Sequence, residues 1–77
     1  MDMSKLPVKG ETWQHTKSGG RYLVLGTAFN AITDHIDVKY APCYDCEYPE
    51  FTRQLMGHQK AWMAPNDDGT PRYTKVK

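Results

Sequence analysis

The chain has 77 residues, of which 39% are hydrophobic and 25% are charged, and its formal net charge is +1. A chain of this length forms one domain with a thin core, which leaves little stability for strained catalytic geometry. Its balanced charge gives no large field of one sign, so extended duplex DNA is not an expected partner.

Neither membrane insertion nor secretion is indicated by the sequence. No window approaches the ~18 consecutive apolar residues of a membrane span, and the first residues, MDMSKLPVKGE, lack the apolar core of a signal peptide. The only cysteines are Cys43 and Cys46, too few for the disulfide framework of a small secreted domain. We therefore expect a cytoplasmic protein with free thiols and no membrane partner.

Charge is distributed unevenly along the chain. Residues 1–33 carry four basic and two acidic side chains, residues 34–50 one basic and five acidic, and residues 51–77 five basic and two acidic. The ends are thus basic and the middle is acidic. This distribution leaves room for a small anionic ligand near the basic segments.

The N-terminal half predicts a flexible segment followed by two strands. Residues 1–10 have no periodicity and should order only where they touch the domain, which is predicted to span residues 11–77. Residues 13–15 predict a short strand. TKSGG predicts a hairpin turn in which Gly19 and Gly20 tolerate positive φ, and RYLVLGTAF predicts the next strand.

The strand RYLVLGTAF is largely apolar on both faces. Simple alternation groups Tyr22, Val24, Gly26 and Ala28 on one face and Leu23, Leu25, Thr27 and Phe29 on the other. Two apolar faces indicate a strand that is covered on both sides, as in a small, strongly bent barrel. Gly26 would permit the bend.

Three further segments complete the predicted sheet. NAITD is a turn, and HIDVKY alternates, with Ile36, Val38 and Tyr40 inward. FTRQLM predicts a short strand leading into a helical turn through GHQKAW, and RYTKV closes the chain after the turn cluster APNDDGTP. The expected fold is mainly all-β, a small SH3-like antiparallel barrel of about five short strands with one short helical turn.

The glycine pair before Arg21 is typical of a hairpin and not of a phosphate-binding loop. A Walker loop needs Lys and Ser or Thr after its last glycine, and a dinucleotide fingerprint needs a helix there. Here a strand follows. Arg21 is either a ligand contact at the strand end or an ordinary exposed arginine.

Catalytic and metal-binding signals are weak. Cys43 and Cys46 have a spacing that one zinc ion accepts, with His15, His35 and His58 as completing ligands, but a second close pair is missing. No nucleophile elbow or paired-carboxylate site is present. We expect no catalytic residue, no metal and no cofactor, and keep a zinc-stabilised domain as a minor alternative.

Aromatic residues make up 12% of the chain, and in so small a domain most of them must be core. Tyr44, Tyr48, Phe51 and Trp62 cluster in sequence near Arg53. Aromatic faces beside a guanidinium form a stacking platform for a base or an anchor for a peptide. The alternative is that these rings are core and ordinary surface.

The segments WQHTKSGGRYLVLGTA, VKYAPCY, FTR and GTPRY together resemble a family of small bacterial and phage domains of unknown function, number 1653 among such domains. The resemblance covers about residues 11–76 and concerns order and spacing. Phe51 and Gln54 stand where the family pattern has Trp and Pro. The matching positions are Trp13, His15, Lys17, Gly20, Tyr22, Val24, Leu25, Ala28, Val38, Tyr40, Tyr44, Arg53, Arg72 and Tyr73.

The resemblance implies an SH3-like architecture in a bacterial cell, including one infected by a phage, and it implies no reaction. We expect a non-catalytic module that binds an anionic or aromatic ligand, such as a nucleotide or a short single-stranded nucleic acid. The candidate residues are Arg21, Arg53 and Arg72 for charge and Tyr44, Trp62 and His15 for stacking. The alternative is a protein-interaction module, such as a phage protein that binds and blocks a host protein.

Overall fold

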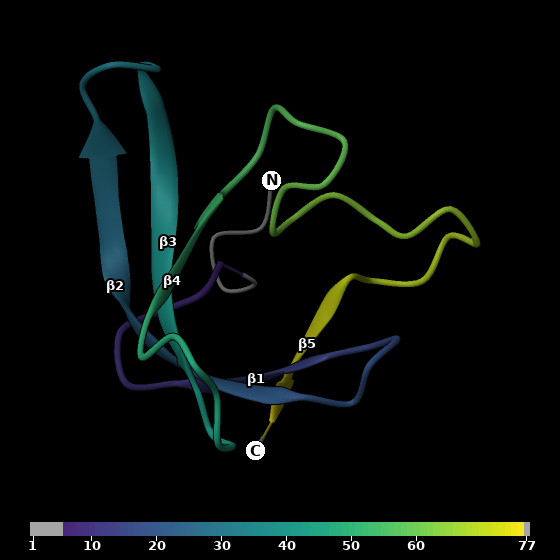
Figure 1. The fold of residues 1–77 in the computed structure, drawn as a ribbon. Helices are drawn as coiled ribbons and strands as arrows, with labels where there is room; N and C mark the ends of the chain where they lie inside the picture. Colours follow the sequence, from purple (N-terminus) through teal and green to yellow (C-terminus); the bar gives the residue numbers. More distant parts are fainter. Residues whose placement is uncertain (1–5, 77) are drawn as a thin grey trace.

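The computed structural model describes residues 6–76 and shows one five-stranded antiparallel sheet (Figure 1). Its strands are β1 (Thr12–His15), β2 (Arg21–Asn30), β3 (His35–Pro42), β4 (Phe51–Gln54) and β5 (Tyr73–Val76), in the spatial order β4-β3-β2-β1-β5. No helix forms within residues 6–76, so none there could cross a bilayer. The predicted all-β, five-stranded antiparallel fold is confirmed.

The sheet is bent but not closed. β4 pairs only with β3 and β5 pairs only with β1 within the described residues, so both remain edge strands. The predicted barrel is therefore not confirmed. The helical turn expected over GHQKAW is also replaced, because Gly57 has a φ of +87° and the chain forms a tight turn in which Ala61 N–H donates to the His58 carbonyl at 3.0 Å.

A β-bulge bends β2 and shifts its side-chain alternation. Val24 lies opposite Tyr40, whereas Gly26 lies opposite Lys39, so one extra residue is inserted in β2. Gly26 has a φ of +145°, which confirms its predicted role in the bend. The predicted face grouping is wrong beyond Val24, because the bulge turns the face carrying Thr27 and Phe29 to the core side of the sheet.

The β2–β3 hairpin turns at residues 31–34, as expected. The Asn30 carboxamide oxygen accepts hydrogen bonds from the N–H groups of Ile32 and Thr33, at 2.9 and 3.2 Å, and Asp34 has a φ of +59°. In β3 the predicted alternation holds for Val38 and Tyr40, which are buried. Towards the turn, the same face becomes exposed.

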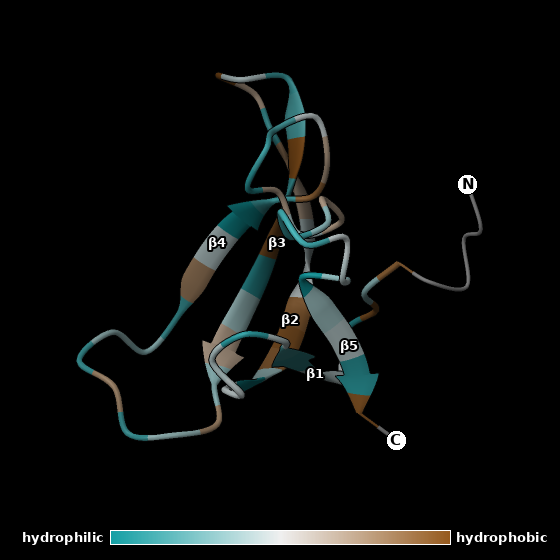
Figure 2. Cartoon of the chain, turned by 90° about the vertical axis from the view of Figure 1, so that its right-hand side faces the viewer, coloured by the Kyte–Doolittle hydropathy of each residue, from teal (hydrophilic) through white to brown (hydrophobic). Residues whose placement is uncertain are grey.

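The far end of this hairpin stands away from the core and carries exposed apolar residues between polar ones (Figures 1 and 2). Phe29 and Ile36 pair across the two strands and are 63% and 46% exposed, and Ile32 at the tip is 92% exposed. We call these three residues the hairpin patch. The prediction that β2 is covered on both faces is wrong here, because these apolar side chains remain exposed even though Leu55 N–H donates to the Ile36 carbonyl at 2.8 Å.

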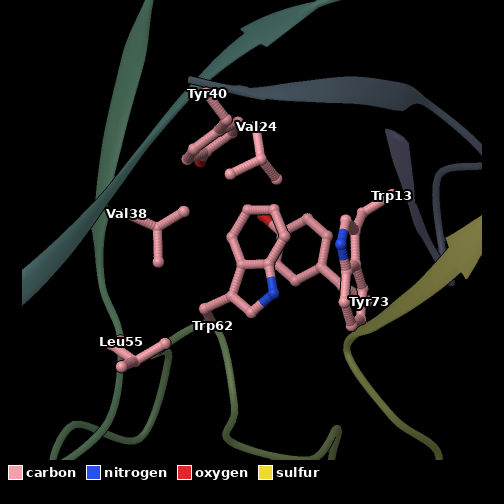
Figure 3. Close-up of a cluster of buried hydrophobic side chains, with 7 residues drawn as sticks. All are labelled: Trp13, Val24, Val38, Tyr40, Leu55, Trp62 and Tyr73. Carbon is pink, nitrogen blue, oxygen red and sulfur yellow. The ribbon is translucent and has the colours of Figure 1, made fainter. Parts of the chain in front are cut away.

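A single aromatic core fills the space between the bent sheet and the segment that joins β4 to β5 (Figure 3). The Trp62 and Tyr73 rings stack with centroids 3.8 Å apart and planes 5° apart, and Tyr40 meets Trp62 edge-on at 5.1 Å. The backbone N–H of Trp62 donates to the Gln54 carbonyl at 2.8 Å, which fixes the segment on the end of β4. The seven core residues are Trp13, Val24, Val38, Tyr40, Leu55, Trp62 and Tyr73.

Residues 6–10 of the predicted flexible segment contact the domain. Leu6 packs against the core, Pro7 is buried, and Gly10 N–H donates to the Val24 carbonyl at 2.9 Å. Glu11 then accepts hydrogen bonds from Val8 N–H and from the Trp13 indole, at 2.8 and 3.1 Å. The rest of that predicted segment, residues 1–5, lies outside the described residues.

Candidate functional site

An aromatic-lined pocket of about 330 Å³ opens on the core side of the sheet. All five strands contribute to its wall, together with the β1–β2 and β3–β4 loops, because the bend brings the end of β1 close to β3 and β4. We call it the aromatic pocket. Its lining residues are His15, Ser18, Tyr22, Tyr40, Tyr44, Phe51, Arg53 and Tyr73.

Tyr22 organises one wall of the aromatic pocket. Its ring meets those of Tyr40, Tyr44 and Phe51 edge-on, with centroids 5.1, 5.7 and 6.4 Å away. The Tyr22 and Tyr44 hydroxyls are hydrogen-bonded at 2.8 Å. Burial is the main cause that raises the pKa of Tyr22 to about 12, and this hydrogen bond is the second cause. The phenol therefore stays neutral at physiological pH.

Arg53 closes the opposite wall. Its Nη1 donates to the Lys60 carbonyl at 2.6 Å, its Nε donates to the Tyr40 hydroxyl at 3.4 Å, and its guanidinium carbon lies 5.4 Å from the Tyr73 ring centroid. These contacts tie β4 to the following segment. Arg53 therefore has a structural role and also places a fixed positive charge beside the aromatic rings.

A second pocket, of about 260 Å³, is polar and contains three basic residues, Lys17, Lys60 and Arg72. His15, which also lines the aromatic pocket, belongs to its wall. The other lining residues are Gln59, Asn66 and Asp67. We call it the cationic pocket. Arg72 is held in place because its Nε and Nη2 donate to the carbonyls of Ala64 and Gln59, at 3.2 and 3.3 Å. Three cations against one carboxylate make this pocket suited to an anion.

His15 forms the boundary between the two pockets. Its Nδ1 lies 2.9 Å from the Ser18 hydroxyl, and its ring packs edge-on against Tyr73 at 5.1 Å. Burial, and then the positive charges of Arg53, Arg72 and Lys17, hold the pKa of His15 below its ordinary value. The imidazole is therefore neutral at physiological pH, because burial and the neighbouring positive charges both disfavour its protonated form.

Four of the six predicted site residues lie at these pockets. His15, Tyr44 and Arg53 line the aromatic pocket and Arg72 lines the cationic pocket. Arg21 is exposed next to the inward-facing Tyr22 and lines neither of them.

Trp62 is not a surface stacking residue as predicted, because it is 2% exposed and stacks on Tyr73 in the core. The segment before it has no hydrophobic periodicity that would have indicated its burial. The prediction of a surface stacking platform rested only on the size of Trp62 and on its position in the sequence near Arg53.

Lys17, Lys60 and Tyr22 line the pockets although the sequence did not indicate them as site residues. Tyr22 could have been found, because strand alternation places it on the same face as Val24. Lys60 could not, because its position depends on how residues 55–72 cross the molecule.

The zinc ligand set kept as a minor alternative is not assembled within residues 6–76. Cys43 and Cys46 are exposed free thiols, and no three His, Cys, Asp or Glu side chains of this part of the chain lie close enough to share a metal ion. His58 Nδ1 instead accepts a hydrogen bond from Lys60 N–H at 3.0 Å.

No family model matches the chain, and neither the curated proteins nor the solved structures contain a match. The likeness to domain family 1653 rests on the sequence segments quoted above. The functional interpretation therefore rests on the geometry of the two pockets.

Proposed function

We propose that this protein is a non-catalytic binding module for a ligand that joins a flat ring to an anionic group, that is, a nucleotide or a short single-stranded nucleic acid. The supporting observation is that the aromatic and cationic pockets share His15 as a common wall. One ligand can therefore occupy both. A base contributes the ring and its phosphate contributes the charge.

The base stacks in the aromatic pocket, where Tyr44 is 47% exposed and Phe51 is half-buried. Stacking on such rings tolerates any base, since every base has a π-face. The phosphate contacts Lys17, Lys60 and the unused N–H groups of Arg72. Because three cations are involved, we expect affinity to fall as salt rises.

The first test is an NMR titration of the ¹⁵N-labelled protein with hexathymidylate, thymidine and inorganic phosphate. Hexathymidylate should shift resonances of both pockets and bind tightest, and phosphate alone should shift only those of the cationic pocket. Tyr44→Ala should weaken hexathymidylate binding about 10-fold through lost stacking. Lys60→Gln should weaken it and lower the salt dependence.

Arg21→Gln is the matched control, because it removes an exposed positive charge outside both pockets. Equal losses for Arg21→Gln and Lys60→Gln would show only non-specific attraction to charge. The absence of any saturable shift at millimolar hexathymidylate would refute the proposal.

His15 provides a pH-dependent prediction. Burial and then the nearby cations depress the pKa of His15, and a bound phosphate offsets the cations, so binding should raise this pKa. By linkage, affinity should then increase as pH falls through the pKa of the complex. The measurement is the titration of the His15 ring nitrogens by NMR, with and without hexathymidylate. An unchanged pKa in the complex, or an equal pH dependence in His15→Gln, would contradict it.

The hairpin patch favours a second candidate, a protein-interaction module such as a phage protein that blocks a host protein. Clustered exposed apolar side chains on a monomer commonly mark protein contacts. Recovery of one stoichiometric partner by the wild type, lost in Ile32→Ser and kept in Tyr44→Ala, would support this function. Loss of the partner in Tyr44→Ala and its recovery with Ile32→Ser would exclude the hairpin patch as the contact.

A further inference from the structure

A third and larger pocket, of about 640 Å³, shares only Arg72 with the cationic pocket, and the proposed function uses none of its other residues. We call it the tryptophan pocket. It lies against the core between β5 and the turn that precedes it. Most of its wall is apolar and is contributed by Trp13, Trp62, Met63, Pro65, Pro71 and Tyr73.

The two tryptophans of this pocket differ in their hydrogen bonding. The Trp13 indole N–H donates to Glu11 Oε1 at 3.1 Å, whereas the Trp62 indole N–H has no acceptor among residues 6–76. Figure 3 shows the Trp62 nitrogen on the side of its ring that faces Trp13. A buried N–H without a partner is uncommon and costs free energy, which an acceptor brought by a ligand would recover.

The charged residues that line the tryptophan pocket are both basic. They are Arg72 and Lys75, and no Asp or Glu is among the lining residues. Arg72 uses Nε and Nη2 on backbone carbonyls, which leaves other N–H groups for a ligand. Lys75 pairs with Glu11 at 2.7 Å, which partly neutralises it, but its side chain is half exposed and keeps N–H groups for a ligand. Both basic residues of the rim can therefore contact an anion.

We infer that the tryptophan pocket binds a flat, apolar carboxylic acid. Its ring system lies against Trp13 and the prolines, and one carboxylate oxygen accepts the Trp62 indole N–H. The charge faces Lys75 and Arg72. The pocket size is typical of small-molecule sites. Because the Trp62 nitrogen is covered in this structure, the side chains around it must move apart slightly on binding.

The experiment uses the full-length, ¹⁵N-labelled protein and three naphthalene probes. 2-Naphthoate carries acceptor and charge, 2-acetylnaphthalene carries the acceptor alone, and 2-ethylnaphthalene carries neither. We expect affinity to fall in this order. Naphthoate and acetylnaphthalene should move the Trp62 indole N–H resonance downfield, and ethylnaphthalene should not, since only an acceptor can form the new hydrogen bond.

Variants separate the two polar contributions. Lys75→Gln should weaken naphthoate binding about 3-fold and leave acetylnaphthalene binding unchanged, with Lys39→Gln, on the exposed side of β3, as the matched control. Trp62→Phe keeps a ring against Tyr73 but removes the N–H. It should weaken both acceptor-bearing probes about 10-fold and spare ethylnaphthalene.

Three outcomes would overturn the inference. They are the absence of saturable binding of any probe, binding that leaves the Trp62 indole resonance of the wild type unmoved, and naphthoate shifts confined to the aromatic pocket. The first two readouts use the wild-type protein, so they do not depend on whether Trp62→Phe folds.

Discussion

Single side chains in this small domain often do two tasks at once. Arg53 faces the aromatic pocket, where the sequence suggested a ligand contact, but it also donates to the Lys60 carbonyl and the Tyr40 hydroxyl. The Glu11 carboxylate likewise accepts hydrogen bonds from the N–H of residue 8, from the Trp13 indole and from Lys75. The hydrogen bond from Lys75 is the largest cause that lowers the pKa of Glu11. Because the core of so short a chain is thin, these contacts add to the limited stability that apolar burial supplies.

Arg53→Ala should therefore destabilise the fold as well as alter the pocket. We expect a loss of about 1–3 kcal/mol in the free energy of unfolding, because the Lys60 carbonyl loses a charged donor and Tyr73 loses its cation–π partner. Urea denaturation followed by circular dichroism measures this. The exposed Arg21→Ala should stay within about 0.5 kcal/mol of the wild type. If both variants unfold like the wild type, Arg53 has no structural role.

Among the elements, β2 determines the shape of the molecule. Its first residues, 21–23, pair with β1, and β3 pairs with it along most of its length, on both sides of the bulge at Val24 and Gly26. A bulge increases local twist and bends the strand. The bend is what lets β1 and β5 bring His15 and Tyr73 towards the residues of β3 and β4.

The bulge makes Gly26 sensitive to substitution for a backbone reason alone. A Cβ atom there would meet no heavy atom within 4 Å, but the φ of +145° is strained for an L-residue. Gly26→Ala should cost about 1–3 kcal/mol in thermal or urea unfolding. A chemically synthesised chain with D-alanine at position 26 should keep most of the stability. Equal losses for both alanines would point to a steric cause instead.

Across the whole molecule, residues 55–72 cover the core by crossing from β4 to β5. Trp62 anchors this crossing, since it is almost fully buried and contacts Trp13, Tyr40 and Tyr73. The aromatic and cationic pockets both depend on it, because Lys60 and Arg53 are fixed relative to each other through this segment.

Trp62→Ala should remove a large part of the stability of the protein. Loss of a buried Trp costs about 3–5 kcal/mol, and a domain of this length has roughly 4–12 kcal/mol in total. Thermal unfolding followed by near-ultraviolet circular dichroism should show a much lower melting temperature. Ile32→Ala, at the exposed tip of the β2–β3 hairpin, is the control and should melt like the wild type. A melting temperature of Trp62→Ala equal to that of this control would contradict the anchoring role.

Local sequence patterns determined the strands and turns. Alternation over residues 36–40 predicted β3, the glycine pair predicted the β1–β2 hairpin, and Asn30 and Asp34 predicted the next turn. Each of these signals depends on backbone preferences within a few residues, which is why it can be seen in the chain alone. The all-β class follows from their number and spacing.

Only the tertiary structure decided which side chains meet. The bulge depends on how β2 packs against two partners, so alternation assigned Thr27 and Phe29 to the wrong face. Trp62 became core and Lys60 became a pocket residue because residues 55–72, which lack periodicity, fold back across the sheet. His15 meets Arg53 and Arg72 across 38 and 57 positions of the chain. Contacts over such separations depend on long-range packing, which no local pattern encodes.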